Sequence, residues 1–323
     1  MRLSVRSAFL SLVSLAMFGC GGPGANDLLG QSSSALEFDG METAHVMRVH
    51  AAHHRRSGGN LFYGGGVGGI GVETAPKIYL VLWGSQWNNN DPSGEASILQ
   101  SFYTGAGNSS SWDNSVTQYC QTAPSGTINC AGVPGAVFAS SNSILAGVWA
   151  DNASAAPSQP TQSQIANEAI NAAAHFGNTG AGSNNSTQYV IATAAGNNSR
   201  GFGTQYCAYH SSISSSFGNV AYTNLPYITD AGASCGANFN GLGPNAGITI
   251  VSGHEFAETQ TDQIPNGGWL DNSGGENGDK CAWIQSGQGA AANVTFSTGT
   301  FPVQSLWSNA FNSGAGGCVL SYP

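Results

Sequence analysis

The stretch VSGHEFAETQTD, residues 251–262, brings together side chains that can hold a metal ion and move a proton. On an α-helix, His254 and Glu258 would share one face, because side chains four residues apart lie about 5–6 Å from each other. They could therefore bind one ion together. Glu255 would be rotated by about 100° around the helix and could reach a water molecule on that ion. Two ligands and a general base are the parts that metal-assisted hydrolysis requires.

The carboxylate at position 258 has a chemical consequence. A carboxylate is an acceptable zinc ligand. Each anionic ligand also lowers the Lewis acidity of the metal, so the bound water is less acidified and harder ions become somewhat more favoured. The alternative is an acidic structural helix that contains one histidine.

Acidic residues are concentrated around this stretch. Of the 13 Asp and Glu residues that follow Arg56, six lie between Glu255 and Asp279. Like charges at this density repel one another unless a cation neutralises them. The run GGWLDNSGGENGDKCAW, residues 267–283, contains Glu276 as the expected third ligand, with Asp271 and Asp279 as alternatives.

HEFAETQTD followed by ENGD resembles the thermolysin-like (gluzincin) metalloproteases. In that family the helix reads His-Glu-x-x-His-x-x-x-Asp, and a glutamate ligand follows further along the chain. The resemblance implies a Zn²⁺ ion held by His254, Glu258 and Glu276, with Glu255 as the general base. It also implies that Asp262 or Asp279 accepts a hydrogen bond from the ring of His254 and orients it. Glu258 departs from the pattern, because the family has histidine there.

A longer series of motifs is similar to an exported bacterial family of predicted metallopeptidases, itself distantly similar to plant phosphate-induced extracellular proteins. The motifs are FYGGG (62–66), KIYLVLWG (77–84), YCAYH (206–210), GHEFAETQTD (253–262), GWLD (268–271) and GENGDKCAW (275–283). This resemblance implies a protein or peptide substrate. In zinc peptidases a second histidine commonly stabilises the oxyanion, which implies that role for His210. The alternative for His210 is a strand histidine packed beside Cys207.

Other classes of function stay open at this point. Ca²⁺ is the main rival ion, because carboxylates and Asn/Gly loops such as DNSGGENGD suit it, although His254 argues against an all-oxygen site. A non-catalytic cell-surface or polysaccharide-binding protein with a structural metal is the second hypothesis. A serine hydrolase is the third, but the chain has no Gly-x-Ser-x-Gly motif at a plausible nucleophile turn.

The N-terminal region predicts export from a bacterial cell. Residues 1–20 contain the apolar run AFLSLVSLAMF, which fits a signal peptide, and Cys20 is a candidate lipid anchor. Residues 21–58 are expected to be a pro-segment or linker, with removal near Arg55-Arg56. No later segment is apolar enough to span a membrane. The six remaining cysteines predict three disulfides, for which the local pairing is 120–130, 207–235 and 281–318.

Residues 59–323 are expected to form a single α+β, zincin-like domain that acts as a monomer. Three Lys or Arg residues against 13 acids after Arg56 exclude nucleic-acid binding through phosphates. Residues 77–84, 187–196 and 219–228 are predicted to be strands of a mixed sheet. Residues 97–105, 160–177 and 248–262 are predicted to be helices, the last being the buried active-site helix. Long Gly/Asn/Ser-rich stretches between them are loops.

Overall fold

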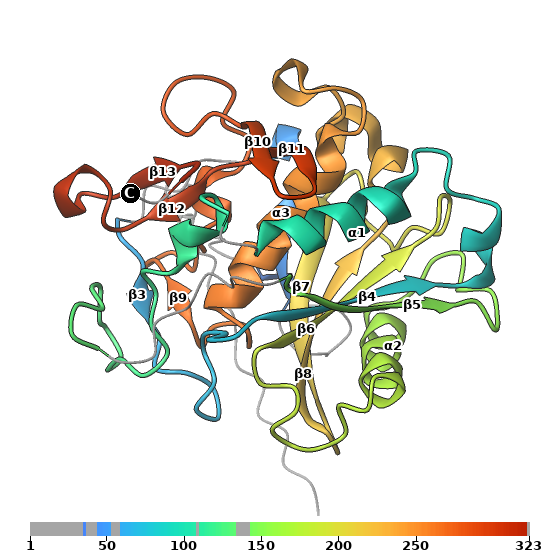
Figure 1. Ribbon diagram of the computed structural model, residues 1–323, viewed down its shortest axis with the longest axis horizontal. Helices are drawn as coiled ribbons and strands as arrows, with labels where there is room; N and C mark the ends of the chain where they lie inside the picture. The colour runs from blue at the N-terminus through green and yellow to red at the C-terminus, as the bar shows by residue number, and fades with distance from the viewer. Residues whose placement is uncertain (1–34, 37–43, 53–58, 108–109, 134–142, 322–323) are drawn as a thin grey trace, which may run out of the picture. The chain divides into compact units, whose positions relative to one another are not determined.

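The apolar run predicted at residues 77–84 forms an interior strand of a mixed β-sheet, β4, which spans Lys77–Trp83 (Figure 1). The computed structural model describes residues 35–36, 44–52, 59–107, 110–133 and 143–321. The signal peptide expected at 1–20, including Cys20, and the dibasic pair Arg55-Arg56 lie outside the described residues. Of the segment expected to be a pro-segment or linker, 21–58, only 35–36 and 44–52 are described.

The sheet has seven strands in the order β1-β2-β7-β8-β6-β4-β5. The pairs β5–β4, β4–β6 and β6–β8 are parallel, whereas the pairs β8–β7, β7–β2 and β2–β1 are antiparallel. The bounds are β1 Ala35–Leu36, β2 Ala44–Arg48, β4 Lys77–Trp83, β5 Leu145–Asp151, β6 Thr187–Thr193, β7 Tyr206–Ser215 and β8 Gly218–Leu225. The predicted mixed sheet and its three predicted strands are therefore confirmed.

Helices cover both faces of the sheet. Side chains alternate across each strand, so Leu80 of β4 faces one hydrophobic cluster and Val81 faces another. The cluster on one face includes residues of α1 (Glu95–Ala106) and α3 (Ala246–Thr261), and the cluster on the other includes residues of α2 (Gln162–His175). Figure 1 shows α2 on the opposite side of the sheet from α1 and α3.

The three α-helices match the three predicted from sequence. Thr161 begins α2 with a capping box, in which its hydroxyl accepts from the backbone N–H of Gln164 and the Gln164 side chain accepts from the backbone N–H of Thr161. In α3 every residue is buried, as the prediction of a buried helix requires. This helix lies against β7 and β8 on one side and against α1 and β11 (Gly299–Val303) on the other.

Three short antiparallel strand pairs and three disulfides complete the described structure. The pairs are β3 Phe62–Tyr63 with β9 Trp269–Leu270, β10 Ala292–Phe296 with β11, and β12 Leu306–Ser308 with β13 Gly317–Val319. The disulfides are Cys120–Cys130, Cys207–Cys235 and Cys281–Cys318, which confirms the local pairing. They indicate an oxidising, extracellular environment. Among the described residues, no helix is both long and apolar enough to cross a bilayer.

Two features differ from the sequence prediction. Connections through α1 and α2 join parallel strands, which gives half of the sheet an α/β character that the α+β prediction did not include. Residues 44–48, which lie in the segment expected to be a pro-segment or linker, form strand β2 and pair with β7. The sheet therefore begins before residue 59, where the prediction placed the start of the domain.

Candidate metal centre

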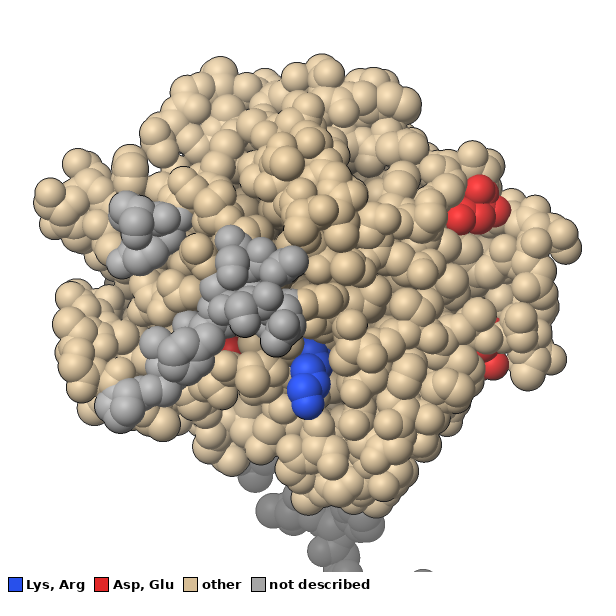
Figure 2. Space-filling model, in the orientation of Figure 1, with Lys and Arg blue, Asp and Glu red and all other residues tan. Residues whose placement is uncertain are grey.

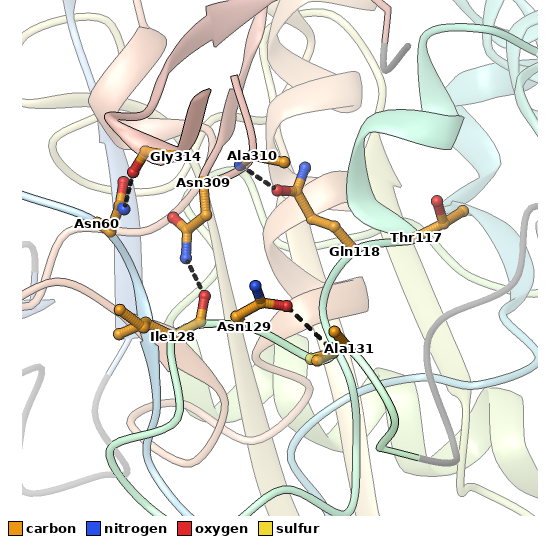
Figure 3. A pocket seen from close by; sticks show the side chains of 10 residues that line it. Asn60, Thr117, Gln118, Ile128, Asn129, Ala131, Asn309, Ala310 and Gly314 are labelled. Carbon is orange, nitrogen blue, oxygen red and sulfur yellow. Dashed lines mark hydrogen bonds between the residues drawn. The ribbon is translucent and has the colours of Figure 1, made fainter. Parts of the chain in front are cut away.

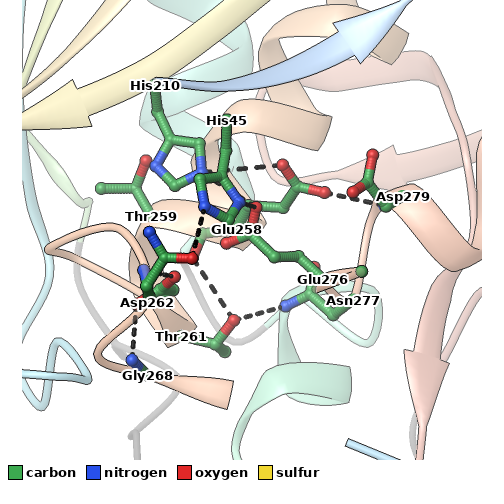
Figure 4. Close-up of polar contacts among 12 residues, drawn as sticks. His45, His210, Glu258, Thr259, Thr261, Asp262, Gly268, Glu276, Asn277 and Asp279 are labelled. Atoms are coloured by element: carbon green, nitrogen blue, oxygen red, sulfur yellow. Dashed lines mark hydrogen bonds and ion pairs between the residues drawn. The ribbon is translucent and has the colours of Figure 1, made fainter. Parts of the chain in front are cut away.

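Helix α3 places His254, Glu255 and Glu258 in the interior, where all three side chains are fully buried. Figure 4 shows Glu258 among the polar side chains that surround it. The face of the molecule in Figure 2 correspondingly shows few charged side chains. Burial of an ionised carboxylate is costly unless it is paired, hydrogen-bonded or bound to a metal. The polar contacts of these three residues are therefore informative about function.

His254 and Glu258 meet as their helical spacing predicts, with Nε2 and Oε1 3.1 Å apart. The other ring nitrogen of His254, Nδ1, donates to Oε1 of Gln304 at 3.1 Å. The amide of Gln304 is oriented by its own NH₂ group, which donates to two carbonyl oxygens, those of Gly278 and Ser305. This arrangement holds the His254 ring with Nε2 toward Glu258, as is usual for a metal-ligating histidine.

Glu276 lies in the same interior but contacts a different pair of histidines. Its Oε2 is 2.6 Å from Nδ1 of His45 and 3.2 Å from Nε2 of His210. His45 stands directly opposite His210 in the antiparallel pair of β2 and β7, so both side chains point from the sheet toward α3. His210 is thus brought into the site as predicted, whereas His45 was not among the predicted site residues.

The ligand atoms fall into three overlapping groups, within each of which they lie within 4.8 Å of one another. The groups are His45, His210 and Glu276; His210, Glu255 and Glu258; and His254, Glu258 and Asp279. The predicted trio of His254, Glu258 and Glu276 is not one of the groups found among the described residues. The structure instead places Asp279 beside His254, with Oδ1 4.0 Å from Nε2, and Glu276 beside His210.

Asp262 anchors the loop that follows α3. Its carboxylate accepts hydrogen bonds from the backbone N–H groups of Asn266, Gly267 and Gly268. A Cβ at Gly268 would lie 1.9 Å from the carbonyl oxygen of Thr261, so only glycine allows this close return of the chain. Of the two residues predicted to support the His254 ring, Asp262 therefore has a different set of partners, and Gln304 makes the hydrogen bond to Nδ1.

Asp271, the alternative third ligand, is engaged elsewhere. Its Oδ2 accepts from Nζ of Lys280 at 2.8 Å, and its Oδ1 accepts from the backbone N–H groups of Ser273 and Gly275. Burial opposes ionisation of Asp271, but the bonds from Lys280 and the loop outweigh it and lower the pKa of the carboxyl. Lys280 is also buried, so its charge is used by this pair.

The excess of negative charge perturbs every histidine of the site. Burial alone would lower the pKa of His254, but the attraction of Glu258 and Glu255 outweighs it and raises that pKa to about 10. By the same balance, Glu276 raises the pKa of His45 to about 10 and that of His210 to about 9. The raised pKa of each histidine shows that the carboxylates of the site lack enough positive charge nearby to balance them.

The carboxylates respond in opposite ways. Burial, with repulsion from Glu258, raises the pKa of Glu255 to about 8. Burial also opposes ionisation of Glu276, but the adjacent His45 and His210 hold its pKa far below the usual range. A carboxyl with a pKa near neutrality is suited to accept and return a proton, and one that is always ionised is suited to hold a cation.

Several ligand atoms have no hydrogen-bond partner among the described residues. They include both carboxylate oxygens of Glu255, Oε2 of Glu258 and Oε1 of Glu276, all on fully buried side chains. Buried polar atoms in native proteins are nearly always satisfied, so atoms left without a partner indicate an absent ligand, ion or water. The donor set of imidazole and carboxylate suits a divalent cation such as Zn²⁺.

Two cavities of the described structure lie away from this site. One, of about 410 Å³, is lined among others by Asn60, Gln118, Asn129 and Asn309, whose amides bond to neighbouring loops (Figure 3). Another, of about 270 Å³, is lined among others by Pro244 and Phe301. Neither includes a member of the three ligand groups, so neither is evidence for a substrate pocket at the metal site.

His45 is the site residue that sequence reasoning missed. It lies within residues 21–58, the expected pro-segment or linker, 231 positions from its partner Glu276. The available signal was the run AHVMRV, residues 44–49, in which β-branched and apolar residues favour a strand. Gln304 carried no signal, because a single glutamine in a loop has no characteristic spacing.

Comparisons of the chain with protein-family models, with curated proteins and with solved structures found no match.

Proposed function

We propose that this protein is an exported, zinc-dependent peptidase. The observation that carries the proposal is the cluster of buried imidazole and carboxylate groups around α3, in which oxygens of Glu255, Glu258 and Glu276 have no hydrogen-bond partner among the described residues. A metal ion would supply the missing positive charge and polarise a scissile carbonyl. The helix beside a mixed sheet is compatible with a zincin-like fold, and peptide hydrolysis is what the sequence resemblance implies.

The roles of the side chains follow from their positions. Glu255 shares a group with His210 and Glu258, and neither of its carboxylate oxygens has a hydrogen-bond partner among the described residues, so this carboxylate is available to accept a proton from water and return it to the leaving amine. His210 projects from β7 and shares a group with Glu255 and Glu258; in a centre with one ion we assign it the role of hydrogen-bond donor to the oxyanion. His254 and Glu258 hold the ion, with Asp279 or Glu276 completing its ligands.

The nitrogen ligands favour zinc over calcium. Ca²⁺ takes six to eight oxygen ligands, whereas the groups here contain imidazole nitrogens from His254, His210 and His45. Tetrahedral N/O coordination is characteristic of Zn²⁺. A carboxylate in place of a second helical histidine will make the bound water less acidic than in a two-histidine site.

The test is Glu255→Gln, with metal content measured by mass spectrometry and casein digestion followed on the same samples. We expect the variant to keep the metal and the fold and to lose hydrolysis, because the amide cannot accept the proton. Glu73→Gln is the matched control, since Glu73 is equally buried but belongs to none of the three groups; it should keep activity. A metal-loaded Glu255→Gln protein that still cleaves casein would refute the mechanism.

The burial of the site favours a second candidate, a non-catalytic surface protein with a structural metal. His254, Glu258 and Glu276 are all fully buried, and structural metal sites are closed in this way. This function predicts that chelation lowers the melting temperature while wild-type protein cleaves no peptide at any metal concentration. Zinc-dependent casein cleavage that chelation abolishes and zinc restores would exclude it.

A further inference from the structure

The ligand groups contain more donors than a single ion can use. Seven side chains take part, namely His45, His210, His254, Glu255, Glu258, Glu276 and Asp279, and all are buried. Zinc in proteins takes about four ligands. Moreover, His254 and His210 never share a group, whereas Glu258 shares a group with each of them. The donors therefore form two centres that meet at Glu258.

The two oxygens of Glu258 face different histidines. Oε1 is 3.1 Å from Nε2 of His254, and Oε2 is 3.8 Å from Nε2 of His210. A carboxylate in this orientation can bridge two ions, and paired catalytic ions lie about 3.5–4 Å apart. Figure 4 shows Glu258 between the two histidine strands, β2 and β7, on one side and the loop that carries Asp279 on the other.

We propose that the centre binds two divalent cations bridged by Glu258. His254 and Asp279 complete the first position, and His45, His210 and Glu276 complete the second. The inference rests on the metal centre proposed above and extends it by a second ion, with His45 and His210 as ligands; in the two-ion centre His210 therefore binds metal instead of donating to the oxyanion.

The spacing of the donor atoms fits two small ions. Zinc lies about 2.0–2.1 Å from nitrogen and oxygen, so neighbouring ligand atoms of a tetrahedral site are roughly 3.3 Å apart. His210 Nε2 and Glu276 Oε2 are 3.2 Å apart, and His254 Nε2 and Glu258 Oε1 are 3.1 Å apart. His45 Nδ1 is closer, at 2.6 Å from Glu276. To bind the same ion as Glu276, the His45 ring would move away from Glu276 by a fraction of an ångström. Its Nε2 would stay near Oδ1 of Asn266, which is 3.3 Å away.

The charges also fit two ions better than one. Glu255, Glu258, Glu276 and Asp279 together bring four negative charges when ionised, and ligating histidines are neutral. One divalent ion would leave two of these charges without compensation in a buried site, whereas two ions balance all four. Lys280, the basic residue next to Asp279, is committed to Asp271.

Metal counting on the full chain tests the proposal independently of activity. Chelator-stripped wild-type protein is titrated with Zn²⁺, and the bound metal is then measured by mass spectrometry. We expect two zinc ions per chain in the wild type, one in His45→Ala, one in Asp279→Ala, and a loss from both positions in Glu258→Ala. His50→Ala is the matched control, because His50 lies in the same segment but contacts Phe239 and Trp283 instead of the site; it should bind two.

Saturation of the wild type at one zinc per chain would overturn the proposal. This result does not depend on the zinc content of the variants, so it holds even where a variant fails to fold. A zinc content unchanged by His45→Ala in a folded protein would also overturn it. Two ions per chain without casein cleavage would leave the dinuclear site standing and refute the peptidase function.

Discussion

Removal of the N-terminal strand tests whether residues 44–52 are a dispensable pro-segment or part of the folded domain. A chain that begins at Gly59 lacks β2 and His45. In this segment Val46, Met47 and Val49 are buried, and burying a Val or Met side chain contributes about 1.5–3 kcal/mol. The loss sums to about 5–9 kcal/mol as an upper bound. Because total domain stability is about 5–15 kcal/mol, the shortened chain should be marginal or unfolded.

The assay compares this chain with a control that begins at Ser32 and retains β1 and β2. Each kcal/mol shifts the melting temperature of a domain of this size by about 2–4 °C, so the lower end of this range corresponds to a decrease of about 10 °C, which circular dichroism would measure. Two further contacts add to the effect, since Trp283 Nε1 donates to the carbonyl of Arg48 and Val49 N donates to that of Gln205. Equal melting temperatures and equal zinc contents would refute the reasoning and support a removable pro-segment.

Two further predictions concern residues around the site. Burial raises the pKa of Glu73 from 4.5 to about 8, although the hydrogen bond from Gln188 lowers it. As the pH rises, Glu73 therefore ionises in the unfolded chain before it ionises in the folded protein. The free energy of unfolding falls by up to about 1.4 kcal/mol per pH unit between pH 4.5 and 8. Glu73→Gln should flatten this decline in melting temperature across that window, and an unchanged pH profile would contradict it. Gln304→Leu removes the acceptor for His254 Nδ1 and should weaken zinc binding about 10–100-fold. Gln304→Glu keeps that acceptor but loses the NH₂ donor to the carbonyls of Gly278 and Ser305, so it should weaken binding less than Gln304→Leu does; competition with a zinc chelator measures both.

The parts of the fold that could be predicted from sequence are those fixed by neighbours along the chain. The capping box at Thr161 predicts where α2 begins, and the spacing of His254 and Glu258 predicts their contact on α3. The three disulfides followed from pairing nearby cysteines. In each case the interacting groups are close in sequence or share one helix, so local geometry decides the outcome.

The rest of the site depends on sheet order, which sequence periodicity does not determine. His45 reaches Glu276 only because β2 pairs with β7 in a register that sets His45 opposite His210. A shift of that register by one residue would turn His45 to the α2 face, where Ala44 and Val46 now pack. Similarly, the choice between Asp279 and Glu276 beside His254 depends on how the loop after α3 folds back. Gly278 permits that return, since a Cβ there would lie 2.9 Å from both Glu258 Oε1 and His254 Nδ1.

The polar interior of α3 is itself an argument for a bound cation over a purely structural helix. A structural polar network stabilises a core only when its members satisfy one another. Around α3 that condition holds at the edges, where Asp262 accepts three backbone N–H groups and Gln304 fixes the ring of His254. It fails at the centre, where both oxygens of Glu255 and one oxygen each of Glu258 and Glu276 have no hydrogen-bond partner among the described residues. A preorganised metal site requires this arrangement. The hydrogen-bonded residues at the edge fix the positions of the ligands, and the ion satisfies the carboxylate oxygens that have no hydrogen-bond partner.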